Sequence, residues 1–236
     1  MSLVTNDDRT KICSYVANSL RELLQHHDDL QTFVKFLNQF DKVVVFGGFV
    51  RGAVHNYLHS DAQEFRDIDL VVVGRLQGPN QHAGNHFGGY RKAFTDGLRV
   101  DYWTLESTFA FTKGLFKPSL ENLSLTTVFT INACLFDPTA RQLFESNAIE
   151  AIAARTISFN CKGYLDLYPE FQAFRAVDFA ERLGYSLDPE VTEFVRNTLA
   201  GCSLQDFIDA VSEHRPDEPL SRLKNMFETY REVHQS

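Results

Sequence analysis

The chain has 236 residues, of which 44% are hydrophobic and 23% are charged, and its formal net charge is −8. This length suits one large domain or a main domain with an appendage, and the composition excludes a disordered, collagen-like or coiled-coil chain. No apolar run approaches the ~20 residues that span a bilayer, so we expect no membrane partner. The acidic balance disfavours extensive binding to duplex DNA, because an acidic surface repels phosphates.

The N-terminal residues and the cysteines indicate the compartment. No basic segment followed by an apolar run opens the chain, so we predict no secretory signal and a cytoplasmic location. The four cysteines are far apart, with no C-x-x-C pair and no histidine at zinc-ligand spacing. The sequence therefore predicts neither a disulfide framework nor a structural zinc site.

Helices and a strand are expected in the first sixty residues. Apolar side chains at three- and four-residue spacing predict two amphipathic helices over residues 7–40. A β-branched run at 42–46 predicts a strand, which Gly47 and Gly48 end in a turn. A helix over residues 49–58 is expected to follow the turn.

Strands and one loop are expected next. Residues 66–74 begin with alternating polar and apolar side chains and end as an apolar strand. The glycine-rich segment 75–89 predicts a loop that covers a substrate. Residues 90–105, with a turn signal at 95–97, predict a β-hairpin, and residues 127–136 predict a further strand.

From about residue 145 the pattern is mostly helical. Three helices are expected over residues 171–183, 189–199 and 204–211. The change from strands to helices near residue 155 divides the chain into a head, 1–155, and a helical region, 156–236. This order of elements predicts an α/β or α+β domain followed by helices.

Two carboxylates are expected on one face of the strand at 66–74. Asp67 and Asp69 are two residues apart, so their side chains point the same way, while Ile68 and Leu70 point into the core and fix the register. Neighbouring carboxylates repel unless a cation lies between them, and oxygen ligands favour Mg²⁺ or Mn²⁺. A solvated strand face would explain the pair equally well.

Gly47 and Gly48 add a second feature of this chemistry. A strand-to-helix turn exposes backbone N–H groups at a helix N-terminus, where phosphates bind, although a plain tight turn needs the same residues. Asp101, in the predicted hairpin, supplies a third carboxylate or is simply a surface acid. Together, the glycine turn, Asp67, Asp69 and Asp101 indicate two-metal phosphoryl chemistry.

Four blocks in the same order resemble one family of enzymes. F-G-G-F-V-R-G at 46–52 and R-D-I-D-L-V-V-V-G at 66–74 are similar to the nucleotidyltransferase signature of the DNA polymerase β superfamily. The resemblance is to class II tRNA nucleotidyltransferases (CCA-adding enzymes) and bacterial poly(A) polymerases. V-F-T-I-N-A-C-L-F-D at 128–137 resembles a strand of that family, and residues 174–190 resemble the start of its helical neck. The resemblance implies an α+β head with a five-stranded mixed sheet, then an α-helical neck.

The resemblance also implies a role for individual residues. The nucleotide-binding candidates are Gly47, Gly48, Arg51 and Asn132. The catalytic and metal-binding candidates are Asp67, Asp69 and Asp101. Asn132 suits a structural role equally well. The implied reaction moves a nucleoside monophosphate from a nucleoside triphosphate, with Mg²⁺ or Mn²⁺, to a hydroxyl of an RNA 3′ end, a small molecule or a protein.

The sequence also departs from the family. Gly52 stands where the family has an aspartate, and Thr-Thr-Val at 126–128 replaces Arg-Arg-Asp, whose arginines would help to hold the nucleotide. Residues 168–172 replace the E-D-x-x-R segment that selects the base, and too little chain follows the neck for a tRNA-gripping body. A catalytically inactive nucleotide-binding regulatory or interaction protein is therefore the alternative.

Overall fold

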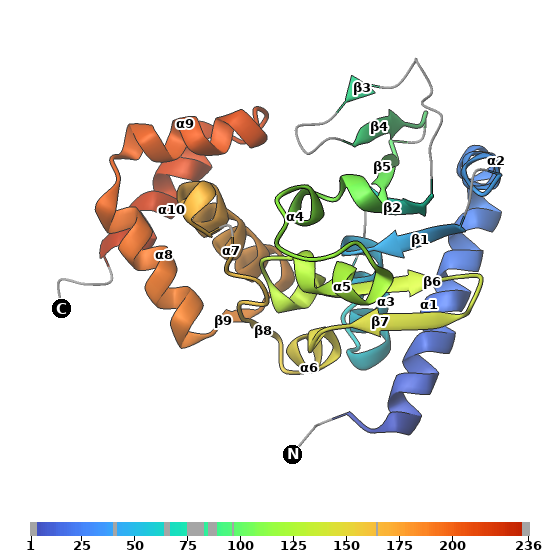
Figure 1. Ribbon diagram of the computed structural model, residues 1–236. Coiled ribbons are helices and arrows are strands. Elements are labelled where there is room, and N and C mark those ends of the chain that lie inside the picture. The colour runs from blue at the N-terminus through green and yellow to red at the C-terminus, as the bar shows by residue number, and fades with distance from the viewer. Residues whose placement is uncertain are drawn as a thin grey trace. The chain divides into compact units, whose positions relative to one another are not determined.

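A computed structural model of the chain shows two compact units (Figure 1). It describes residues 4–39, 42–63, 67–74, 83–84, 89–95, 97–163 and 165–232. The first unit is Met1–Thr127 with Ile131–Ala154, and the second is Val128–Thr130 with Arg155–Ser236. Most of the segment 75–89, which we expected to cover a substrate, lies outside the described residues.

The first unit is built on a mixed sheet with the strand order β3-β4-β5-β2-β1-β6-β7. The strands are β1 (Lys42–Phe46), β2 (Asp67–Val73), β3 (Ala83–Gly84), β4 (Tyr90–Ala93), β5 (Arg99–Thr104), β6 (Cys134–Asp137) and β7 (Gln142–Glu145). β2 runs parallel to β5 and antiparallel to β1, and β4 and β5 form the expected hairpin. The α+β class is confirmed, with seven strands where five were expected.

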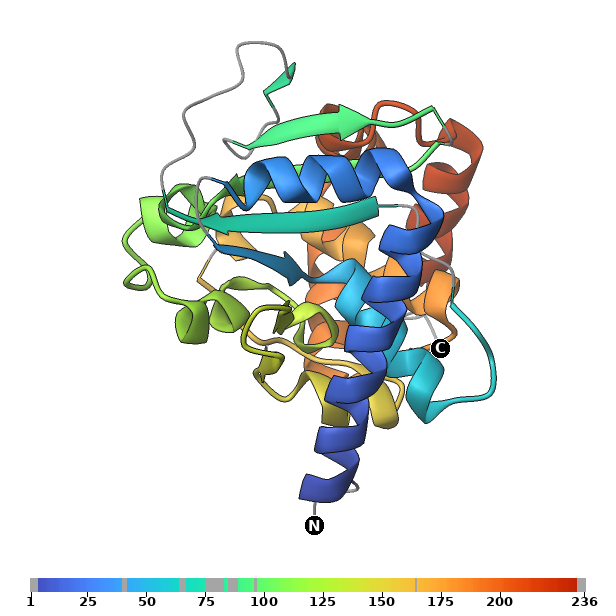
Figure 2. The ribbon, with the colours of Figure 1, turned by 90° about the vertical axis from the view of Figure 1, so that its right-hand side faces the viewer.

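Helices cover one face of this sheet, as Figure 2 shows for α1 and α2. The helices of this layer are α1 (Asn6–His26), α2 (Asp28–Leu37), α3 (Gly48–Leu58) and α6 (Ala148–Ala153). Val43, Val45, Ile68 and Leu70 point toward α1 and α2, as their alternation along β1 and β2 requires.

The opposite face of the sheet has its own apolar cluster. Val44, Val71 and Leu135 pack there against Leu105 and Phe111. Short helical segments supply this layer: η1 (Leu105–Ser107), α4 (Phe109–Thr112), α5 (Leu120–Leu123) and η2 (Ser124–Thr126). On this side of β2, Asp67 is exposed and Asp69 is half-buried, and burial begins only at Val71, so the first polar residues of the strand remain accessible on this face.

The second unit is helical apart from two short strands. Its elements are η4 (Leu165–Leu167), α7 (Pro169–Leu183), α8 (Pro189–Gly201), α9 (Leu204–His214), α10 (Leu220–Glu232), β8 (Thr156–Ile157) and β9 (Ser186–Leu187). Asp188 begins α8 by accepting a hydrogen bond from the Val191 N–H, and Gly184, with φ +66°, ends α7. Among the described helices, none has the length and apolar character to cross a bilayer.

The strand predicted over residues 127–136 is wrong in its first half. Residues 130–132 form a 3₁₀ turn, η3, and only residues 134–137 pair in the sheet. The backbone before the turn belongs instead to the second unit, where the Asn160 N–H donates to the Val128 carbonyl and Phe129 stacks on Phe159. The conformation of this segment is therefore set by contacts with residues distant in the sequence, which the local pattern of β-branched and aromatic residues does not specify. The same pattern also missed β7.

Candidate active site

Polar side chains form a row across the face of the sheet that carries the apolar cluster, at one end of β1, β2 and β5. The register places Phe46 opposite Asp69, Asp69 opposite Asp101, and Asp101 opposite Arg91. Neighbouring strands lie about 4.8 Å apart, and residues directly opposite one another share a face. Asp69 and Asp101 are therefore adjacent on one face of the sheet. Asp67, two residues before Asp69 on β2, lies on the same face, as the alternation along the strand predicted. We call Asp67, Asp69 and Asp101 the acid row.

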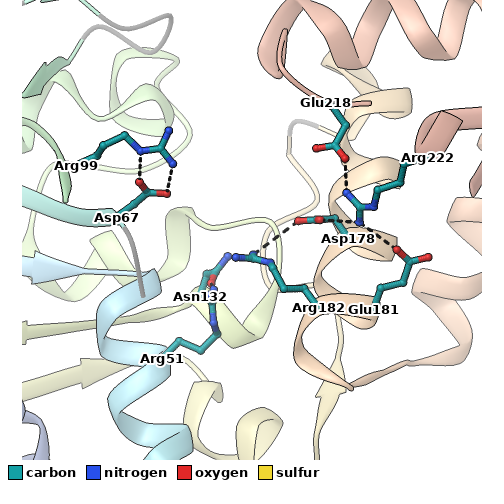
Figure 3. A network of polar contacts seen from close by, with 9 residues as sticks. All are labelled: Arg51, Asp67, Arg99, Asn132, Asp178, Glu181, Arg182, Glu218 and Arg222. Atoms are coloured by element: carbon teal, nitrogen blue, oxygen red, sulfur yellow. Dashed lines mark hydrogen bonds and ion pairs between the residues drawn. The ribbon is translucent and has the colours of Figure 1, made fainter. Parts of the chain in front are cut away.

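Two arginine forks neutralise part of the acid row. Arg91 Nε and Nη2 each lie 2.8 Å from an oxygen of Asp101. Arg99 Nε lies 2.7 Å and its Nη2 3.3 Å from the Asp67 carboxylate (Figure 3). The hydrogen bonds to Asp101, opposed by burial and aided by the charges of Asp67 and Asp69, raise the pKa of the Arg91 guanidinium. Arg91 therefore lies in the field of the whole row.

The sequence patterns predict no role for Arg91 or Arg99. A signal for Arg91 was present, because counting outward in equal steps from the turn at 95–97 pairs Arg91 with Asp101 across the hairpin. Arg99 lies two residues before Asp101 on the same strand, and the parallel register places it opposite Asp67. Finding Arg99 required knowledge of which strands pair.

The glycine turn lies directly beside Asp69. Gly47 has φ +64° and ψ −117°, and its N–H donates to the Cys134 carbonyl over 3.0 Å. A Cβ built on Gly47 would lie 3.4 Å from Asp69 Oδ2. Gly47 is the N-cap of α3 and has no side chain to occupy the N–H groups of the first turn. A phosphate at this helix end would approach the Asp69 carboxylate, and two anions so placed require a cation between them.

Arg51 and Asn132 lie together in the interior of the first unit. Each has less than a tenth of its surface exposed, and Arg51 Nη1 donates to Asn132 Oδ1 (Figure 3). Arg51 Nη2 is 3.9 Å from the Cβ position of Gly48, so a buried positive charge lies next to the glycine turn. Asn132 thus has a structural role in holding Arg51. Direct contact of either residue with a nucleotide stays a prediction.

The acid row supplies oxygen donors of the kind that Mg²⁺ prefers. In the described part of the chain, no group of three or more histidine, cysteine, aspartate or glutamate side chains is arranged to hold a metal ion. Mg²⁺, however, is commonly bound by one or two carboxylates together with phosphate oxygens and water. Asp69 and Asp101, adjacent and next to the glycine turn, fit this chemistry. The assignment of Asp67, Asp69 and Asp101 as metal ligands stays a prediction.

Two departures from the family motifs are visible as buried polar residues. Thr126 is buried, and its hydroxyl donates to the Leu123 carbonyl over 2.7 Å. Gln172, in α7, is also buried and accepts a hydrogen bond from Arg175 over 3.1 Å. Both side chains serve local structure.

The α+β first unit and the helical second unit are similar in fold to solved tRNA nucleotidyltransferases. Solved structures with this fold include a CCA-adding enzyme in complex with ATP, with a TM-score of 0.58 and 16% identity over 89% of this chain and 54% of that one. A tRNA nucleotidyltransferase complexed with a primer tRNA and an incoming ATP analogue has a TM-score of 0.55 and 19% identity over 80% of this chain and 57% of its own.

The CCA-adding enzyme of Thermotoga maritima, complexed with tRNA, is similar at a TM-score of 0.53 and 17% identity, over 80% of this chain and 46% of that one. The resemblance in fold inferred from the sequence is therefore confirmed. The chain spans about half the length of these enzymes. No protein-family model matches the sequence, and no curated protein matches it significantly.

Proposed function

We propose that the chain is a metal-dependent nucleotidyltransferase that moves a nucleoside monophosphate from a nucleoside triphosphate to an acceptor hydroxyl. The observation that carries this proposal is the register of β2 and β5, which sets Asp69 opposite Asp101 beside the Gly47 turn. A helix N-terminus for phosphate and a pair of carboxylates for a divalent ion then lie side by side, as phosphoryl transfer requires.

Each part of the site has a task in this reaction. The first turn of α3 would bind the triphosphate, close to the buried Arg51 charge, and Asp69 and Asp101 would hold Mg²⁺. Mg²⁺, when bound, lowers the charge on the phosphates and acidifies the acceptor hydroxyl. Asp101 orients that hydroxyl and accepts its proton. A bond forms from the hydroxyl oxygen to the α-phosphorus, the bond from that phosphorus to the β-phosphate oxygen breaks, and pyrophosphate leaves.

Two observations bear on the identity of the acceptor. The structural neighbours include enzymes complexed with tRNA, which makes an RNA 3′ end one candidate. The net charge of −8 favours a small molecule or a protein hydroxyl in the cytoplasm.

Calorimetric titration with ATP, CTP, GTP and UTP, each with Mg²⁺, tests the proposal. We expect one or more nucleotides to bind the wild type and to lose affinity in Asp69→Asn and Asp101→Asn. Glu106→Gln is the matched control, because it removes an exposed carboxylate shortly after β5 and outside the acid row. Failure of all four nucleotides to bind the folded protein would contradict the proposal.

A second candidate is a nucleotide-binding regulatory protein without turnover. The observation that favours it is the pairing of Asp67 and Asp101 with arginines, which neutralises both carboxylates without a metal. This protein would bind a nucleotide equally well with Mg²⁺ or with EDTA, and substituting Asp69 would leave that affinity unchanged. The same titration, repeated in EDTA, distinguishes the two.

A further inference from the structure

Arg91 is the outer and more accessible partner of the pair that it forms with Asp101. Its fork makes two hydrogen bonds of 2.8 Å, one to each carboxylate oxygen. The Arg91 side chain is 53% exposed, whereas that of Asp101 is 19% exposed. Releasing such an arginine to another anion has a small free-energy cost, because exposed ion pairs contribute little to stability.

A divalent ion at Asp69 and Asp101 would change what Arg91 faces. It would take over one Asp101 oxygen and repel the guanidinium, so Arg91 could not keep both of its hydrogen bonds there. A triphosphate beside the Gly47 turn would bring phosphate oxygens to the same face. A guanidinium fork binds phosphate oxygens in the same two-point manner as it binds a carboxylate.

We propose that Arg91 is an exchangeable cation of the site: it is the counter-ion of Asp101 without metal, and it becomes a ligand of the triphosphate when a divalent ion takes Asp101. This inference rests on the proposed function. It makes Arg91 a competitor of the metal and a helper of the nucleotide, two effects of opposite sign on binding. A residue that merely supports the fold would change both affinities in the same direction.

Lys92 provides a matched control. It is the next residue of β4, so its side chain lies on the other face, where its Nζ is 4.6 Å from the centre of the Phe33 ring. Arg91→Gln and Lys92→Gln therefore remove the same charge from the same strand on opposite faces. Arg91→Lys retains the charge and removes the two-point fork.

The test compares two titrations of the full chain: Mn²⁺ alone, followed by the paramagnetic resonance signal of free Mn²⁺, and inorganic tripolyphosphate in saturating Mn²⁺. Relative to Lys92→Gln, we expect Arg91→Gln to bind Mn²⁺ up to about fivefold more tightly, the most that loss of an exposed ion pair allows. We expect it to bind tripolyphosphate several-fold more weakly, with Arg91→Lys between wild type and Arg91→Gln in both.

Each outcome decides the inference. If either affinity of Arg91→Gln equals that of Lys92→Gln, or if both fall together, the exchange is wrong while the proposed function stands. If the wild type binds neither Mn²⁺ nor tripolyphosphate, the proposed function fails and takes the inference with it.

Discussion

Replacing Gly47 by alanine tests whether the turn beside Asp69 is shaped for a ligand. The Gly47 backbone, at φ +64° and ψ −117°, is in a region that residues with a Cβ rarely adopt. The added methyl group would be 3.4 Å from Asp69 Oδ2, an ordinary van der Waals contact, so the cost is backbone strain. We expect the free energy of unfolding to fall by about 1–3 kcal/mol.

The functional effect should exceed this structural one. The methyl group would occupy the space between the first turn of α3 and the Asp69 carboxylate, where the proposal places a phosphate. We expect nucleotide affinity to fall by at least about tenfold, which corresponds to about 1.4 kcal/mol of binding free energy.

Gly114→Ala is the control for strain alone. Gly114 has φ +72°, and among the described atoms nothing lies within 4 Å of its Cβ position. We expect it to cost about 1–2 kcal/mol of stability and to leave nucleotide affinity unchanged. Urea unfolding followed by circular dichroism gives the stabilities, and calorimetry at native conditions gives the affinities. Unchanged stability in Gly47→Ala, or equal losses of affinity in both variants, would refute the reasoning.

Three further predictions concern ionisable groups outside the acid row. Burial raises the pKa of the Asp137 carboxyl, but hydrogen bonds from Lys42 and from backbone N–H groups outweigh it and lower the pKa below the ordinary 3.8. The Asp137–Lys42 pair therefore stabilises the fold above pH 3.8, and this stabilisation is lost as the pH falls through the lowered pKa. Asp137→Asn should flatten this acid dependence of the unfolding free energy in urea titrations. Burial raises the pKa of Cys134 to about 12, so at pH 8 a thiol reagent should label the partly exposed Cys13 and Cys202 before Cys134, as mass spectrometry would show. Equal labelling rates for the three cysteines would contradict this. Arg222 joins three carboxylates (Figure 3), so Arg222→Gln should lower the unfolding free energy by about 1–3 kcal/mol. Arg182→Gln, which breaks one ion pair of 3.7 Å and a contact with the Phe179 ring, should lower it by clearly less.

The face of β2 could be predicted from the sequence because alternation encodes it directly. Ile68 and Leu70 are buried, and Asp67 and Asp69 are on the other side, as the pattern requires. The hairpin carrying Asp101 was equally local, since its turn residues and strand lengths lie within sixteen residues of chain.

The neighbours of the acid row depend on pairing between distant segments. Nothing local specifies that β5 lies parallel to β2, and this register alone brings Asp101 to Asp69 and Arg99 to Asp67. The segment around Phe129 is the clearest failure, because this β-like pattern belongs to the second unit and bridges to Phe159 there, whereas β6 pairs in the sheet of the first unit. Local sequence patterns predict the direction of a side chain, but they do not specify which residues it contacts.

The most direct test of the central claim is a crystal structure of the chain with Mg²⁺ and a non-hydrolysable analogue of the nucleoside triphosphate that binds most tightly. We expect the triphosphate at the first turn of α3, a metal ion bound by Asp69 and Asp101, and Arg91 turned from Asp101 to the phosphates. A triphosphate bound away from the Gly47 turn, or a nucleotide bound there with no metal at Asp69 and Asp101, would contradict it.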